Sequence, residues 1–196
     1  KQLYQSFPEI FPESVGGKLK PCTCNDNPEE KVKEKFHKRG CYYTYWNRNV
    51  HRWIKKVVTL SYALDLDCDY LVWVDADCKF LQHTPEKLIA SYLDNWDSFH
   101  FRGPKRAVEE TGIVGYNFKL KGKLLIETLL IRYTSGIFRK DTRWDDCFQY
   151  QRARLSIGAH CRDMAAHCRT TNPIPESEFG KYICHYKGSH GRAGIV

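Results

Sequence analysis

The 196-residue chain lacks long apolar runs, internal repeats and low-complexity segments. No apolar run approaches the ~20 residues that a membrane-spanning helix needs, so we expect no membrane span. No signal-peptide pattern occurs in the sequence, which begins at Lys1, and no Asn-x-Ser/Thr glycosylation site occurs either. Hydrophobic residues make up 42% of the chain and charged residues 28%, a balance that predicts a single globular domain over residues 1–196.

A disulfide framework is also missing from the sequence pattern. The nine cysteines are an odd number and are spread through apolar and strand-like contexts, unlike those of small secreted domains. This usage favours reduced thiols and a cytoplasmic location. Cys22 and Cys24 could be half of a zinc site, but no matching pair follows at a suitable spacing. The stretch from Gly158 to Cys168 repeats a His-Cys pair, for which packing or lining of an acceptor site is favoured over a metal.

The net charge of +8 indicates an anionic partner. Nucleic acid, an anionic membrane and phosphorylated small molecules all fit this charge, and composition does not choose among them. The basic residues are dispersed without a known nucleic-acid motif, which weighs against a basic nucleic-acid-binding module. No Gly-rich phosphate loop is found, which weighs against a metal-dependent nucleotidyl or phosphoryl transferase. Both classes stay open as alternatives.

Apolar periodicity predicts helices that alternate with strands. This alternation indicates an α/β fold with a mostly parallel sheet, in which ligands bind beyond the carboxyl ends of the strands. We expect helices over 27–38, 51–64, 84–93, 123–133 and 143–155, strands over 18–25, 41–46, 70–74, 98–101 and 111–117, and a loop from Thr170 onwards.

The strand predicted over Tyr70–Val74 ends abruptly at Asp75-Ala76-Asp77. Residues i and i+2 of a strand point the same way, so both carboxylates can converge on one point. Two converging carboxylates need a shared cation, and Mg²⁺ and Mn²⁺ commonly bridge carboxylates to substrate phosphates. The alternative is a plain turn, in which aspartate is common.

Four segments, in order, resemble the GT-A glycosyltransferases, which use nucleotide-sugar donors. "YLVWVDADCKF" is similar to their Asp-x-Asp strand end, and "ETGIVGYN" to the (N/E)TG strand of the retaining families. "RWDDCFQYQ" resembles their (x)DDQ helix start, and "HYKGSHG" their C-terminal His-x-x-Gly-x-Lys segment. The nearest overall likeness is to the small soluble glycosyltransferase domains of large algal (chlorella) viruses, which decorate capsid protein.

The resemblance implies a Rossmann-like GT-A sheet flanked by helices, with a smaller acceptor-side sub-sheet. A nucleotide-binding half would cover about residues 1–80, and an acceptor-binding half about 81–196. The activity implied is transfer of a hexose-type sugar from a UDP-sugar to a glycan or glycoprotein, such as a viral capsid glycan. The location would then be the host cytoplasm, without nucleic acid or a membrane span.

The resemblance also implies a metal site for Mn²⁺ or Mg²⁺. Asp77 would be its main ligand, Asp75 a helper and His185 the third ligand. His190 stands where the family has Lys, so that either Lys187 supplies the cation or His190 itself binds phosphate or metal. The remaining donor contacts would come from Lys55, Lys56, Ala76, Thr111, Gly112 and Gly188. For the two lysines, an ordinary solvated helix face is an equal alternative.

Three carboxylates are candidates for catalysis under this resemblance. Asp145 and Asp146 would lie near the anomeric carbon or the acceptor hydroxyl, and Glu110 is the further candidate. The alternatives are that the aspartates merely favour a helix N-terminus and that Glu110 lies on a strand edge. Cys147 stands where the family has Gln, and we interpret it as a core thiol. Retaining stereochemistry is favoured, with a carboxylate acting as nucleophile or stabilising an oxocarbenium-like transition state.

Overall fold

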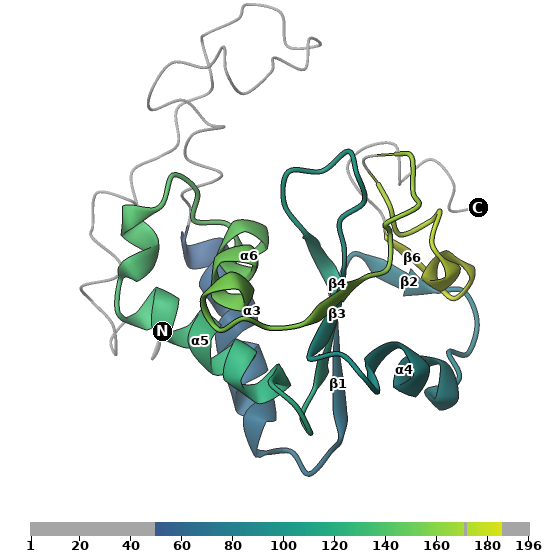
Figure 1. The fold of residues 1–196 in the computed structure, drawn as a ribbon, viewed down its shortest axis with the longest axis horizontal. Coiled ribbons are helices and arrows are strands. Elements are labelled where there is room, and N and C mark those ends of the chain that lie inside the picture. The colour runs from purple at the N-terminus through teal and green to yellow at the C-terminus, as the bar shows by residue number, and fades with distance from the viewer. Residues whose placement is uncertain (1–49, 171, 186–196) are drawn as a thin grey trace, which may run out of the picture.

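The structure, a computed structural model, describes residues 50–170 and 172–185 (Figure 1). The elements expected over 18–25, 27–38 and 41–46, together with Cys22, Cys24, Lys187, Gly188 and His190, lie outside these residues. The helices are α3 (Val50–Tyr62), α4 (Glu86–Leu93), α5 (Gly122–Thr134) and α6 (Asp146–Ser156), with short 3-10 turns η4 (Ala63–Asp65), η5 (Ile137–Lys140) and η6 (Glu178–Lys181). The strands are β1 (Tyr70–Val74), β2 (Cys78–Phe80), β3 (Ser98–Phe101), β4 (Glu110–Asn117), β5 (Cys161–Asp163) and β6 (Ile183–His185).

The main sheet is mixed. Its strand order is β1-β4-β3-β5, and β4 pairs antiparallel with both β1 and β3, whereas β3 and β5 are parallel. The α/β class is therefore confirmed, but the mostly parallel sheet is not, because two of these three pairings are antiparallel. The difference comes from β4: β1, β3 and β5 all run the same way, and β4 lies between β1 and β3 in the opposite direction.

Strand β4 divides two hydrophobic cores. All eight of its residues are buried, and successive side chains point to opposite faces of the sheet. Val114 and Tyr116 face the core formed with α3, α5 and α6, while Ile113 faces the core with α4, η6 and β6. Figure 1 shows the same arrangement, with the three longer helices on one side of the sheet and α4 with the two-stranded sheet on the other. Glu110, Thr111 and Gly112 thus lie on a strand that is packed on both faces.

Helix α3 is amphipathic, as its sequence predicts. Val50, Ile54, Val57 and Leu60 are buried at helical spacing against the first core. Lys55 is exposed, but Lys56 turns inward, with a side chain only 10% exposed. Among the described residues, no helix is long and apolar enough to cross a membrane.

The segment expected to be a loop from Thr170 contains a strand, so that prediction is wrong for residues 183–185. Strand β6 pairs antiparallel with β2, and the register places Cys78 opposite His185. Three-residue strands carry too little alternation to be recognised locally. This small sheet brings the end of the chain's described part to the Asp-x-Asp turn.

Candidate functional site

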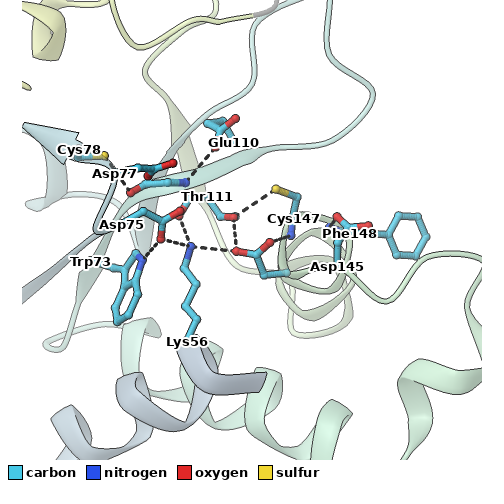
Figure 2. Close-up of polar contacts among 12 residues, drawn as sticks. Lys56, Trp73, Asp75, Asp77, Cys78, Glu110, Thr111, Asp145, Cys147 and Phe148 are labelled. Atoms are coloured by element: carbon cyan, nitrogen blue, oxygen red, sulfur yellow. Dashed lines mark hydrogen bonds and ion pairs between the residues drawn. The ribbon is translucent and has the colours of Figure 1, made fainter. Parts of the chain in front are cut away.

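The Asp75-Ala76-Asp77 turn follows β1 and is fixed by backbone hydrogen bonds. The Asp75 amide donates to the Gly112 carbonyl oxygen at 2.7 Å, and the Cys78 amide donates to the Asp75 carbonyl oxygen at 3.0 Å. Figure 2 shows the two side chains near each other, with dashed lines joining Asp75 to Lys56 and Trp73. The Asp75 carboxylate accepts hydrogen bonds from Lys56 and from the Trp73 indole, whereas Asp77 pairs with His185.

The Lys56 ammonium joins three segments that are distant in the sequence. Its Nζ lies 3.1 Å from Asp75 Oδ1 and 2.9 Å from Asp146 Oδ2, and it also donates to the Thr111 carbonyl oxygen (Figure 2). Burial by itself would lower the pKa of Lys56, but the attraction of Asp146 and Asp75 raises it above 10.5. Lys56 is therefore charged and neutralises carboxylates, instead of lying on a solvated basic face.

Asp146 is held as a buried, ionised carboxylate. Thr111 Oγ1 donates to its Oδ2 at 2.7 Å, and the Cys147 amide donates to its Oδ1 at 3.0 Å. Burial tends to raise the pKa of Asp146, yet the Lys56 charge and these hydrogen bonds lower it below 3.8. The Asp146 side chain is 11% exposed, so its negative charge is largely shielded from solvent.

His185 lies between two carboxylates. Its Nε2 is 3.1 Å from Asp77 Oδ1, and its Nδ1 is 3.9 Å from Glu110 Oε1, beyond hydrogen-bond length. Glu110 is also held by Arg106 at 3.1 Å and by the Gly112 amide. A Cβ atom at Gly112 would lie 2.6 Å from the His185 ring, so only glycine leaves room for the imidazole here.

Asp145 has the contacts of a helix N-cap. Its side chain accepts from the Phe148 amide at 3.1 Å and pairs with Arg143 at 2.8 Å, and it is 5% exposed. Cys147 is half-buried, with its thiol 3.2 Å from Thr111 Oγ1, and burial followed by the nearby Asp146 charge raises the pKa of the thiol. These contacts fit the expectation of a core thiol. The contacts of Asp145 agree with the alternative that this aspartate stabilises the N-terminus of a helix, here α6.

The structure brings Asp75, Asp77, Glu110, Asp146 and His185 together, with Lys56, Thr111 and Gly112 among them. Lys55 and Ala76 are exposed, and Lys55 lies outside this cluster. Sequence reasoning missed Trp73, Cys78 and Arg106. Trp73 and Cys78 flank the Asp-x-Asp turn, which is the only local signal they carry.

Two groups in the described part of the chain could hold a cation. Ligand atoms of Asp77, Cys78 and His185 all lie within 4.8 Å of one another, and those of Asp145, Asp146 and Cys147 do so too. In the second group, Asp145 caps α6 and Asp146 is paired with Lys56. The first leaves Asp77 57% exposed and accessible to a substrate, so its donor set fits a divalent metal better.

Comparisons of the chain with protein-family models, with curated proteins and with solved structures find no match. The interpretation of the site therefore depends on its residues and their geometry.

Proposed function

We propose that the protein is a metal-dependent glycosyltransferase that moves a hexose-type sugar from a UDP-sugar to a glycan or glycoprotein acceptor. One observation carries the proposal: Asp77 Oδ1 and His185 Nε2, far apart in the sequence, lie 3.1 Å apart, and the Asp77 side chain is 57% exposed. A paired carboxylate and imidazole at a strand end suit a cation that holds the diphosphate of a nucleotide sugar.

Asp77 and His185 would be the ligands of that cation. A divalent metal supplies Lewis-acid stabilisation of the charge that grows on the departing nucleoside diphosphate. The Asp75 carboxylate is neutralised by Lys56 in this structure, so its helper role would be to position Lys56 beside the donor. Glu110 faces the second nitrogen of His185 and would orient the ring.

Asp146 is the carboxylate best placed to face the sugar. It is ionised, rigidly hydrogen-bonded and shares Lys56 with the Asp-x-Asp turn. A fixed negative charge stabilises an oxocarbenium-like transition state without needing to reorganise, which is consistent with the retaining chemistry favoured above. The basic excess of the chain, +8, also suits an anionic donor.

The proposal is tested by incubating the protein with a panel of UDP-sugars and Mn²⁺ and measuring UDP release with and without glycan acceptors. Asp77→Ala should abolish metal-dependent release, while circular dichroism shows an unchanged fold. Asp67→Asn, at an exposed position before β1, is the matched control and should retain activity. Activity that persists in Asp77→Ala with the same metal dependence would overturn the proposal.

A further inference from the structure

Cys78 is a sulfur donor that the proposed metal site does not yet use. Its thiol lies on β2 directly across from His185 on β6, and side chains of directly opposed residues share one face of a sheet. Its Sγ lies within 4.8 Å of the ligand atoms of Asp77 and His185. The three side chains thus offer one oxygen, one sulfur and one nitrogen around a common point.

The distances fit a shared ion. Two ligand atoms that each lie ~2.1 Å from a tetrahedral zinc ion are about 3.4 Å apart. His185 Nε2 and Asp77 Oδ1 are 3.1 Å apart, so a cation can bridge them with little movement. Asp75, by contrast, is paired with Lys56, so Cys78 would replace it as the second ligand that the resemblance implied.

A second, independent observation is the unsatisfied nitrogen of His185. The side chain is only 4% exposed, and its Nδ1 is buried without a hydrogen-bond partner. A buried polar atom without a hydrogen-bond partner is costly and calls for an explanation. With Nε2 bound to a metal, Nδ1–H would face the Glu110 carboxylate, now 3.9 Å away, as the outer partner that metal-bound histidines usually have.

We infer that Asp77, Cys78 and His185 form a three-ligand site with an open position, and that its thiolate shifts metal preference from Mg²⁺ and Mn²⁺ towards Zn²⁺ and Co²⁺. Soft thiolate ligands select for such metals, and three protein ligands with one open position are typical of reactive zinc sites. On binding, the thiol proton is released to solvent and the Sγ–metal bond forms. The inference deepens the proposed function, because the open position would take a diphosphate oxygen of the donor.

The test uses Co²⁺ alone, without nucleotide, on the chelator-treated and reduced 196-residue chain. A thiolate ligand gives a sulfur-to-cobalt charge-transfer band in the near ultraviolet, which oxygen and nitrogen ligands do not give. We expect this band in the unaltered protein and its loss in Cys78→Ser. The affinity for Co²⁺ should also fall at least about tenfold.

Cys184→Ser is the matched control. Cys184 precedes His185 on β6, pairs with Lys79 and therefore lies on the opposite face from Cys78. Its variant should keep the band. A missing band in the unaltered protein, or a band that persists in Cys78→Ser, would overturn the inference. This test contains no UDP-sugar, so a missing band would overturn the sulfur ligand without contradicting metal-dependent UDP release. A band in a protein that releases no UDP would overturn only the proposed function.

Discussion

Lys56 decides the electrostatics of the site at the scale of single residues. It lies on the helix before the Asp-x-Asp strand, where the sequence allowed either a nucleotide contact or a solvated face. The structure instead makes it the common partner of Asp75 and Asp146, with its side chain 10% exposed. A buried cation between two carboxylates fixes their positions, but removal of one member leaves unpaired charge behind.

Lys56→Met should therefore destabilise the protein by ~3–5 kcal/mol, because Asp146 would remain buried without its counter-charge. Urea unfolding followed by circular dichroism measures the change. Lys55→Met, at the exposed neighbouring position, should shift stability by less than about 0.5 kcal/mol. The double variant Lys56→Met/Asp146→Asn should lose less than the sum of the single variants. Equal stability of the two single lysine variants would contradict the buried ion network.

The same network predicts a pH dependence. The pKa of Asp146 is lower in the folded state than its ordinary value of 3.8, because the Lys56 charge and hydrogen bonds outweigh burial. Such a group stabilises the fold above the unfolded-state pKa and loses that contribution as the pH falls through the folded-state pKa. The difference in unfolding free energy between the unaltered protein and Asp146→Asn should be constant above about pH 5 and shrink in more acidic solution. A difference that grows on acidification would contradict the assigned charge.

At the scale of elements, two glycines of β4 let rings from β6 and β3 pack close against its backbone. Gly112 and Gly115 lie on this strand, and each leaves room for a ring from another element: His185 for Gly112 and Phe99 for Gly115. The first close approach serves the site and the second serves the core. Strand β4 therefore contributes both to the hydrophobic cores and to the candidate site.

Gly112→Ala should lower the affinity for Co²⁺ or Mn²⁺ at least about tenfold. The new Cβ would lie 2.6 Å from the present position of the His185 ring, so the ring would have to move. Metal titration and thermal unfolding of the same sample separate binding from folding. Gly115→Ala is the comparison, since its Cβ would lie 2.2 Å from the Phe99 ring. It should lower stability by ~1–3 kcal/mol through overpacking. Unchanged metal affinity in Gly112→Ala would show that the ring position does not matter for the site.

The elements also show what the sequence could predict. The bounds predicted for the strands Tyr70–Val74 and Ser98–Phe101 are those of the structure. The first is a run of apolar and aromatic residues that ends at Asp75, and the second alternates polar and aromatic residues. The strands β2, β5 and β6 were not predicted, because three residues cannot display a period. The direction of β4 depends on the path of the chain, which no local pattern records.

At the scale of the whole molecule, the site forms where segments from both halves of the chain meet. The Asp-x-Asp turn could be singled out from a strand that ends in carboxylates. The inward turn of Lys56 and the pairing of Cys78 with His185 could not, since their partners lie far along the sequence. The two cores on either side of the sheet hold these segments in place, while the Asp77 side chain is exposed to solvent.

The proposed function requires that Asp77 and His185 hold a nucleotide through a divalent metal. The most direct test is calorimetric titration of UDP into the protein without metal, with Mn²⁺ and with Co²⁺, repeated on Asp77→Ala. UDP should bind only when both a divalent metal and Asp77 are present. UDP binding that is unchanged in Asp77→Ala would contradict this role of Asp77. Binding of GDP or nucleic acid in place of UDP would contradict the proposed function.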